Sequence, residues 1–258
     1  MSLSRKEFDV LTSIEASKSP DFTQQASGHS LGSVNKTLHL LEDAGLVSEN
    51  QITEKGLEAL EPYRVKRAVL LAAGFGSRLV PVTLNTPKPL VRVKGVRMID
   101  TLLDAVLAAG IEDIVIVRGY LGEQFDQLLY KYPQIRFIEN PAYNESNNSN
   151  YLGVPTEKTD DWCFETKNRI ITKLKVGGLN CHHMFGISYW NQHDGAQMAE
   201  HIREVFTMPG GRERYWDQVA LEYFIKNYKI EVRECTFDDI IEVDSFSDLK
   251  KLDHSYCC

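Results

Sequence analysis

The stretch VLLAAGFGSRLVPVTLNTPKPL, residues 69–90, decides how the larger part of this chain folds. Its apolar start predicts a buried strand. Gly74 and Gly76 then allow a tight turn and a close approach of the backbone to a ligand. Successive backbone N–H groups in such a turn bind anions. Arg78 adds a forked cation suited to phosphate oxygens, and Lys88, between two prolines, adds a compact one. The stretch therefore predicts a phosphate site at the end of a strand.

Two common phosphate-binding loops do not match this stretch. A Walker loop needs GxxxxGK[ST], which is absent from the sequence. A dinucleotide loop needs a third glycine, and Leu79 stands at that position. The sequence therefore disfavours a Walker ATPase and an NAD-binding fold.

From Arg67 onward, strand-like and helix-like segments alternate with short links. AVLLAAG, IEDIVIVRGY and IRFIEN are predicted strands, with MIDTLLDAVLAAG and GEQFDQLLYKY as helices between them. This order predicts an α/β domain over residues 67–258. Its sheet should be doubly wound, Rossmann-like and mixed but mostly parallel. Ligands in such folds bind at the carboxyl ends of strands, where the glycine loop lies.

Residues 1–66 follow a different pattern, of helices and a short hairpin. Apolar residues recur at helical spacing, and residues 30–44 form a second amphipathic segment that ends before Gly45. The segment resembles the MarR-like winged helix-turn-helix domains of bacterial regulators. The resemblance implies DNA as a partner, with Ser33, Asn35 and Lys36 facing the major groove. However, residues 1–66 hold seven Lys and Arg against ten Asp and Glu. Because phosphate neutralisation drives DNA affinity, a packing or dimerisation module is the alternative.

The string LAAGFGSRL followed by TPKPL resembles nucleotidyltransferases that join a nucleoside monophosphate to a phosphorylated small molecule. The resemblance covers residues 67–258. It implies that Arg78 contacts the leaving pyrophosphate and that Lys88 neutralises charge at the reacting phosphates. It also implies a set of nucleotide-binding residues: Leu71, Ala72, Ala73, Gly74, Phe75, Gly76, Ser77 and Gly119.

The later segments resemble the bacterial CTP:phosphocholine cytidylyltransferases, and also relatives acting on other small phosphorylated alcohols or amines. A quaternary ammonium cannot donate hydrogen bonds, so aromatic faces and carboxylates hold it. Each aromatic taken alone also has a core-packing alternative. The predicted substrate-binding residues are Asn148, Asp161, Trp162, Tyr189, Tyr215, Trp216, Asp217 and Glu242. A sugar-1-phosphate nucleotidyltransferase is the alternative enzyme. A transcriptional regulator that senses CTP or CDP-choline is the alternative outside enzymes.

The resemblance further implies Mg²⁺ as cofactor, with Asp244 as a ligand at the end of an apolar strand. Glu242, two residues earlier, should lie on the same face of that strand. The segment CHHMF, residues 181–185, is disfavoured as a metal site, because adjacent residues of a strand point to opposite faces.

One element of the family pattern is missing. After Asn148 the family has a helix and a strand that ends in a second acidic metal ligand. Here thirteen residues separate Asn148 from Trp162, too few for such a crossover. Either a segment near residues 148–150 is deleted, or a segment there has been left out of the sequence. The second is favoured because every other motif is intact.

Bulk properties place the protein among soluble chains. No apolar run approaches the ~18–20 residues that span a membrane, and the first residues lack a signal-peptide pattern. Five scattered cysteines predict reduced thiols and a cytoplasmic location. The net charge of −7 disfavours binding of nucleic acid or membranes by the whole molecule. The oligomeric state is open, and a dimer is compatible with the sequence.

Overall fold

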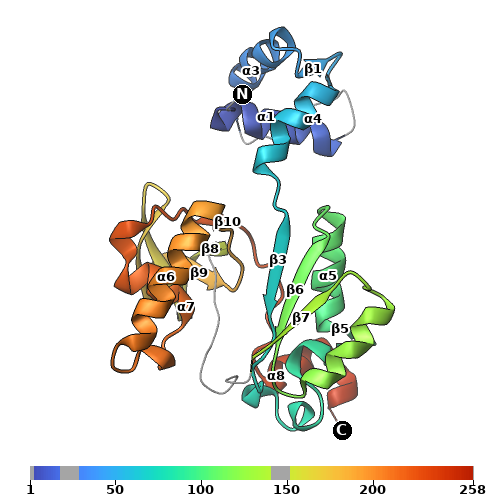
Figure 1. The fold of residues 1–258 in the computed structure, drawn as a ribbon, viewed down its shortest axis with the longest axis vertical. Coiled ribbons are helices and arrows are strands. Elements are labelled where there is room, and N and C mark those ends of the chain that lie inside the picture. Colours follow the sequence, from blue (N-terminus) through green and yellow to red (C-terminus); the bar gives the residue numbers. More distant parts are fainter. Residues whose placement is uncertain (1–2, 18–28, 141–151, 258) are drawn as a thin grey trace. The chain divides into compact units, whose positions relative to one another are not determined.

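The computed structural model describes residues 3–17, 29–140 and 152–257 (Figure 1). Contacts divide the chain into two units, Met1–Lys66 and Arg67–Cys258. Among the described residues, no helix combines the length and the apolar character needed to cross a membrane.

The N-terminal unit consists of helices and one short hairpin (Figure 1). Val10, Leu11, Ile14 and Leu41 are buried in its core, which accounts for the helical spacing seen in the sequence. Gly45, with a φ of +70°, follows the second helix. The elements are α1 (Arg5–Ser17), α3 (Leu31–Asp43), the antiparallel pair β1 (Val47–Ser48) and β2 (Gln51–Ile52), α4 (Glu54–Leu60) and a 3₁₀ helix, Glu61–Tyr63.

The second unit begins with a three-stranded parallel sheet in the order β3-β6-β7. Leu103, Ile114, Ile116, Phe125 and Leu128 pack between this sheet and the segments that connect its strands. The α/β fold with a parallel sheet predicted from the sequence is confirmed here. The elements are β3 (Arg67–Leu71), α5 (Met98–Ala108), β6 (Asp113–Arg118), a 3₁₀ helix (Gly122–Tyr130) and β7 (Arg136–Glu139).

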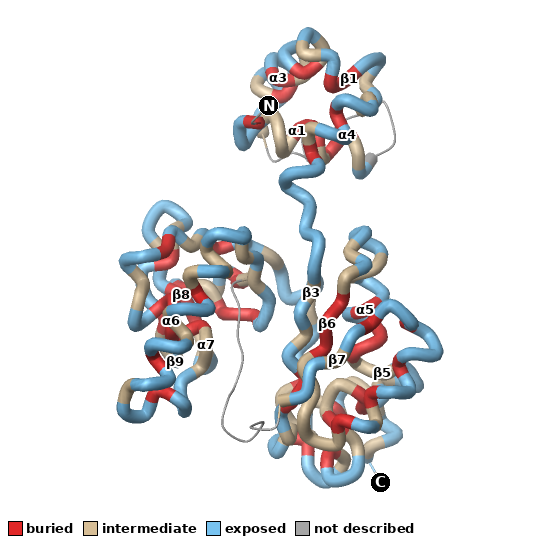
Figure 2. The backbone as a smooth tube through the Cα atoms, in the orientation of Figure 1, coloured by how far each residue is buried: buried red, intermediate tan, exposed pale blue. Residues whose placement is uncertain are grey.

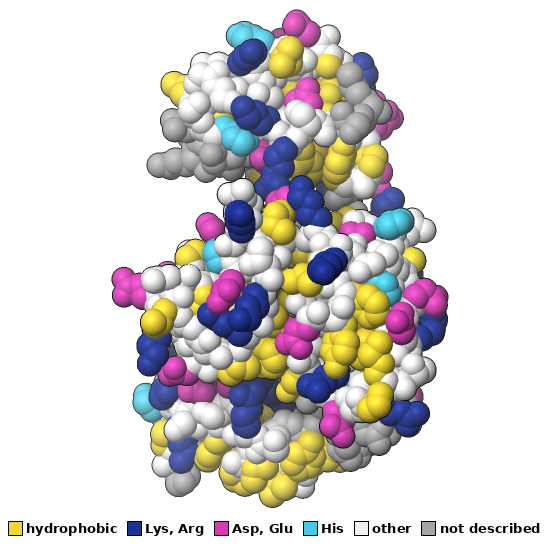
Figure 3. Space-filling view, turned by 90° about the vertical axis from the view of Figure 1, so that its left-hand side faces the viewer, with side chains coloured by type: hydrophobic (Ala, Val, Ile, Leu, Met, Phe, Trp, Pro, Cys, Tyr) yellow, Lys and Arg dark blue, Asp and Glu magenta, His cyan; other side chains and the backbone are white. Residues whose placement is uncertain are grey.

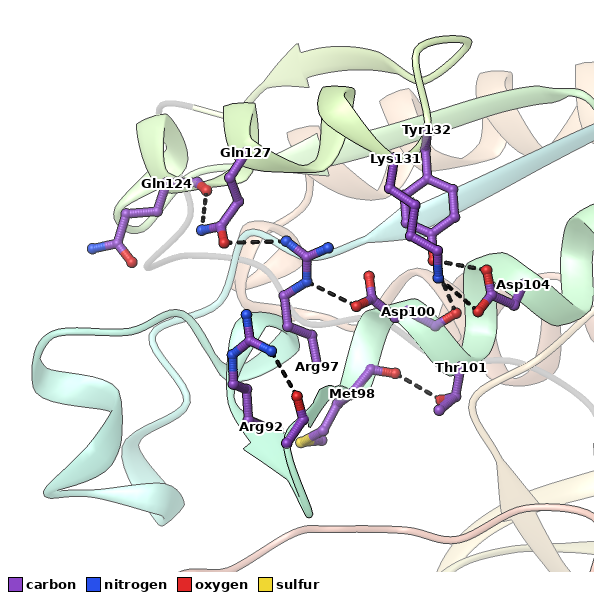
Figure 4. Close-up of polar contacts among 11 residues, drawn as sticks. Arg92, Arg97, Met98, Asp100, Thr101, Asp104, Gln124, Gln127, Lys131 and Tyr132 are labelled. Atoms are coloured by element: carbon purple, nitrogen blue, oxygen red, sulfur yellow. Dashed lines mark hydrogen bonds and ion pairs between the residues drawn. The ribbon is translucent and has the colours of Figure 1, made fainter.

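Polar contacts join α5 to the segment around the 3₁₀ helix, as Figure 4 shows. Arg97 donates from Nε to Asp100 at 2.9 Å and from Nη1 to Gln127 at 3.1 Å. Asp104 accepts from Lys131 at 2.9 Å and from the Tyr132 hydroxyl at 2.8 Å. These contacts pair the charged groups with one another, which assigns them to holding the two segments together.

One face of this sheet is partly exposed, unlike the buried strand that the sequence predicted. Val69, Leu71 and Ile138 are 55%, 41% and 53% exposed, and β3 is largely pale blue in Figure 2. Parallel sheets normally carry helices on both faces. Within the described residues these three side chains are about half exposed, so the prediction of a buried β3 is wrong for one face.

Three later strands form a second, separate sheet in the order β10-β8-β9. Among the described residues it shares no ladder with β3, β6 or β7, so the predicted single doubly wound sheet is wrong. A parallel crossover needs a dozen or more residues before its next strand. Here twelve residues separate the end of β7 at Glu139 from the start of β8 at Leu152, the bare minimum for such a crossover, and β8 pairs with β9 and β10 instead. The strands are β8 (Leu152–Lys167), β9 (Ile170–Phe185), antiparallel to it, and β10 (Arg233–Glu234), parallel to it.

Helices cover this second sheet, and Phe164, Val205 and Leu221 lie in the core between them. The helices are α6 (Gln192–Thr207), α7 (Trp216–Gln218), a π-helical turn (Val219–Tyr223) and 3₁₀ helices Gly211–Glu213 and Ile225–Asn227.

The C-terminal segment returns to the glycine loop. Val243 packs with Leu79, Val91 and Leu249 in a small core of its own. Residues 240–244 belong to no strand, so the predicted strand before Asp244 is wrong: no neighbouring strand in the described residues offers it a ladder. The local elements are 3₁₀ helices Ser77–Leu79, Val82–Leu84 and Lys88–Leu90, the hairpin β4 (Arg92–Val93) and β5 (Val96–Arg97), α8 (Phe246–Leu252) and a last 3₁₀ helix, His254–Tyr256.

Candidate functional site

The glycine loop is anchored at the carboxyl ends of β3 and β6. The amide of Ala72 donates to the carbonyl of Val117 at 2.8 Å, and the amide of Tyr120 donates to the carbonyl of Ala73 at 3.0 Å. These bonds continue the β3–β6 pairing past the last ladder residues. They bring the loop and Gly119, which precedes Tyr120, to the same edge of the sheet.

The backbone at Gly76 requires a glycine. Its φ is +69°, in the left-handed region. A Cβ atom there would lie 3.1 Å from Lys88 Cβ and 3.2 Å from Thr83 Cγ2. The buried Thr83 hydroxyl also donates to the Gly76 carbonyl at 2.9 Å. Gly74, in contrast, is exposed with no atom within 4 Å of an added Cβ, so the loop leaves open space there.

Two aromatic rings, those of Phe75 and Tyr120, pack against each other at the loop. Phe75 and Tyr120 meet edge to face with centroids 4.5 Å apart. The Tyr120 hydroxyl donates to the carbonyl of Leu84 at 2.9 Å, between the two halves of the motif. The sequence analysis did not identify Tyr120 or Thr83 as residues of the site. A signal was present, because Thr83 is a polar residue between the two motif halves and Tyr120 follows Gly119 at a strand end.

Arg78, Lys88 and Asp244 converge at this loop. Arg78 Nη2 and Lys88 Nζ each lie 3.2 Å from Asp244 Oδ1. The Arg78 side chain is 68% exposed and the Lys88 side chain 32%, so Lys88 is the more firmly enclosed of the two cations. Both can exchange this carboxylate for phosphate oxygens, which bind guanidinium and ammonium groups with comparable geometry. The arrangement suits a polyphosphate with an acid beside it.

The side chains at this loop meet only part of what a Mg²⁺ site requires. The described residues contain no group of three or more His, Cys, Asp or Glu side chains placed to hold a metal ion. Asp244 supplies a hard carboxylate oxygen next to the loop, with its side chain 31% exposed. Magnesium is commonly held by one or two carboxylates together with substrate phosphates. These residues fit a Mg²⁺ ion carried by a nucleotide and do not form a cage of their own.

Glu242 is held by a histidine rather than left free. His183 Nε2 lies 3.2 Å from Glu242 Oε2, and His183 Nδ1 lies 2.9 Å from Thr159 Oγ1. The hydrogen bond to Glu242 raises the pKa of His183, against the lowering effect of burial; the charges of Asp161 and Asp244 raise it further. His182 meets another carboxylate, Glu234, at 3.2 Å. The adjacent histidines therefore have different partners, as expected for neighbours on a strand.

Three of the predicted aromatic residues lie in two edge-to-face groups. Trp162 and Tyr215 have centroids 5.5 Å apart. Trp190 lies 5.9 Å from Trp216 and 5.6 Å from Tyr228. All three tryptophans pack partly against the core of the second sheet, so packing accounts for part of their burial.

The remaining predicted substrate residues have contrasting environments. Tyr189 is 62% exposed, whereas Asp217 is 1% exposed and therefore lies away from the surface. Asp161 is exposed, and its Oδ1 accepts from the Trp162 amide at 2.7 Å. Asn148 lies outside the described residues.

The predicted DNA-contacting residues lie on α3 of the N-terminal unit. Asn35 and Lys36 are exposed and Ser33 is half-buried, whereas Val34 and Thr37 are buried in the unit. On the face drawn in Figure 3, basic and acidic side chains are interspersed. DNA binding stays a prediction.

Comparison with known proteins begins with a family model described as nucleotidyl transferase, which matches residues 67–154. A 2-aminoethylphosphonate cytidylyltransferase from Lancefieldella rimae is 30% identical over 228 residues, which cover 73% of this chain and 92% of that protein. The solved structure of a CTP:phosphocholine cytidylyltransferase from Streptococcus pneumoniae has a TM-score of 0.66 and 28% identity. It covers 74% of this chain and 99% of that one.

A mannose-1-phosphate guanyltransferase from Neurospora crassa is 44% identical over 66 residues, but these cover 26% of this chain and 18% of that protein. The similarity to this sugar enzyme is therefore local.

The alignment with the L. rimae protein also bears on the missing segment. It spans 228 residues, whereas 73% of this chain's 258 residues is about 188. About 40 aligned positions therefore hold residues of the relative and none of this chain. The junction predicted at residues 148–150 lies outside the described residues.

Three findings agree: the glycine loop with its two cations, the parallel α/β sheet, and a 30% identical relative matched over nearly its full length. The chain therefore belongs to the nucleotidyltransferase family.

Proposed function

We propose that this protein transfers CMP from CTP to a small phosphorylated or phosphonylated amine and releases pyrophosphate. Phosphocholine is the first candidate acceptor and 2-aminoethylphosphonate the second. Two relatives that extend over most of residues 67–258 are cytidylyltransferases for such acceptors. The local extent of the sugar-enzyme match makes a sugar-1-phosphate acceptor the weaker alternative.

One observation carries the proposal: Arg78, Lys88 and Asp244 meet at the glycine loop although Asp244 lies far along the chain. Backbone N–H groups of the loop would bind the triphosphate. Arg78 would hold the pyrophosphate as it leaves, and Lys88 would balance charge at the α-phosphate. Mg²⁺ carried by CTP and touched by Asp244 would add neutralisation of the phosphate charge.

The reaction needs no side-chain nucleophile. An acceptor phosphate or phosphonate oxygen attacks the α-phosphorus in line. A new P–O bond forms while the bond to the pyrophosphate oxygen breaks, and the electron pair leaves with pyrophosphate. Positioning and charge neutralisation supply most of the acceleration in such transfers.

The acceptor's cationic end would lie against the aromatic residues of the second sheet. Trp162 and Tyr215 form an edge-to-face pair, and the exposed carboxylate of Asp161 stands next to Trp162. An aromatic face attracts a quaternary ammonium, whereas a primary ammonium gains more from direct hydrogen bonds to carboxylates. The balance between these groups therefore sets the choice between the two acceptors.

A regulator that senses nucleotide is the alternative. It is favoured by the N-terminal unit, which exposes Asn35 and Lys36 on α3, and by the single carboxylate at the phosphate site. In this alternative the second unit binds CTP or CDP-choline and controls DNA binding by the first.

A pyrophosphate-release assay tests the proposal with four nucleoside triphosphates against phosphocholine, 2-aminoethylphosphonate and a sugar-1-phosphate. Release with CTP and one of the first two acceptors is the expected result. No release with any pair, together with CTP-dependent binding of DNA, would favour the regulator. Equal use of all acceptors would contradict the assignment of the aromatic residues.

A further inference from the structure

Two neighbouring histidines on β9 each meet a carboxylate, but only one of these carboxylates is fixed by its own backbone. Glu234, the partner of His182, lies on β10, which forms a ladder with β8. Glu242, the partner of His183, lies in residues 240–244, which belong to no strand or helix. The side-chain contact therefore matters more for the position of Glu242 than for that of Glu234.

His183 is itself held from several sides. Its Nδ1 lies 2.9 Å from Thr159 Oγ1 across the hairpin. Its ring lies 5.2 Å from the Phe185 ring and 5.6 Å from the Phe237 ring, measured between centroids. Its side chain is 10% exposed. A ring contacted at both nitrogens and on two sides has one orientation, so its Nε2 marks a defined point for a carboxylate.

The segment that carries Glu242 also carries the acid of the phosphate site. Asp244 follows two residues later and contacts Arg78 and Lys88. Two residues span about 7 Å at most, so the position of Glu242 limits where Asp244 can lie. Val243, between them, is buried against Leu79 and Leu249, which anchors the segment from its other side.

We propose that His183 is a positioning residue, which holds Glu242 and, through it, Asp244 in place relative to the glycine loop. Its catalytic consequence rests on the proposed function, because Glu242 is one of the carboxylates assigned to the acceptor's cation. His183 touches neither reacting atom. It links the second sheet, which carries the aromatic residues, to the segment that completes the phosphate site.

Hydrogen–deuterium exchange of the full chain tests the positioning role without any need for turnover. His183→Ala should raise amide exchange in residues 236–244 by about tenfold, as expected for loss of a hydrogen bond to a charged group. His182→Ala is the matched control and should leave that segment unchanged. His183→Gln keeps a donor near the position of Nε2 and should restore most of the protection.

A buried ring can also be needed for folding, so Glu242→Gln is measured in parallel. It keeps the size of the side chain, weakens the bond to His183 and should raise exchange in the same segment. Equal exchange of residues 236–244 in wild type, His183→Ala and Glu242→Gln overturns the proposal. A rise spread equally over β8, β9 and the segment in both variants also overturns it, since the histidine then acts on the whole sheet.

Kinetics separate this proposal from the proposed function. His183→Ala should raise the KM for the acceptor by about tenfold, because Glu242 loses its fixed position. His183→Gln should recover the acceptor KM. Protection that depends on His183 in a protein with no turnover refutes the transferase and keeps the positioning role. Turnover with an unchanged acceptor KM and unchanged exchange in His183→Ala refutes the positioning role and keeps the transferase.

Discussion

Gly76 is the residue on which the geometry of the loop depends. Its positive φ and the closeness of Lys88 and Thr83 leave no room for a side chain. The sequence identified this glycine as a turn residue. It did not show that Thr83 holds the Gly76 carbonyl from beneath, since that contact needs the loop to close on itself.

Gly76→Ala should lower the free energy of unfolding by about 1–2 kcal/mol, because an alanine is forced into the left-handed region. Gly74→Ala is the control: it lacks a positive φ and has open space around its Cβ. Urea unfolding at neutral pH measures both. Equal stability of the two variants would contradict this view of the loop.

Lys88→Ala should slow pyrophosphate release by about 10²-fold, the cost of removing one preorganised group that stabilises developing charge. Lys173→Ala removes an exposed lysine on β9 and should not change the rate. Steady-state kinetics at saturating CTP measure the effect. A rate within about twofold of wild type for Lys88→Ala would remove Lys88 from the mechanism.

At the scale of elements, α8 begins at a local capping signal. Ser245 Oγ accepts from the Asp248 amide at 3.2 Å, and Asp248 Oδ2 accepts from the Ser245 amide at 3.0 Å. This reciprocal capping begins the helix directly after Asp244. The Ser245 hydroxyl and then Lys251 lower the pKa of Asp248 from 3.8 to about 2.

Asp248→Asn should lower the free energy of unfolding by about 1 kcal/mol at pH 7. A lowered pKa means that the ionised form stabilises the fold. The difference between wild type and variant is therefore complete above the unfolded pKa near 3.8 and shrinks as the pH falls toward about 2. Denaturant unfolding between pH 7 and pH 3 measures it. Asp160→Asn, at a side chain 89% exposed, should show no such loss.

At the scale of the whole molecule, the described strands of the second unit form two three-stranded sheets and a small hairpin, where one sheet was predicted. Two observations bear on this difference and are independent of each other. One is the partly exposed face of β3 and β7, and the other is the set of about 40 positions in the alignment with the L. rimae protein that this chain does not fill. Both are expected if a segment between the two sheets is missing from the sequence. Intact-mass spectrometry of the protein made from its native gene should then give a mass above 29.3 kDa. A mass of 29.3 kDa would mean that the deletion is real, and the protein should then be inactive.

The phosphate site should function without the N-terminal unit. Every contact of the phosphate site lies within residues 67–258. Removal of residues 1–66 should therefore leave the Kd for CTP within about twofold of the full chain by calorimetry. A loss of CTP binding would show that the N-terminal unit takes part in the site.

The sequence by itself determined the local features of this protein. The helical spacing of α1 and α5, the glycine loop and its two cations follow from residue types and short spacings, which act over a few residues. The family resemblance added Asp244 to the predicted site. Its contact with Lys88 joins residues far apart in the chain.

Only the tertiary structure decided the rest. It showed which face of β3 is covered, that β8 and β9 belong to a separate sheet, and that Glu242 is held by His183. Strand pairing and burial depend on which segments meet in space. The pattern of apolar residues in a strand is the same whichever sheet the strand joins, so the sequence does not reveal its partners. The role of His183 has the same origin, because its partners Thr159 and Glu242 lie 24 and 59 positions away along the chain.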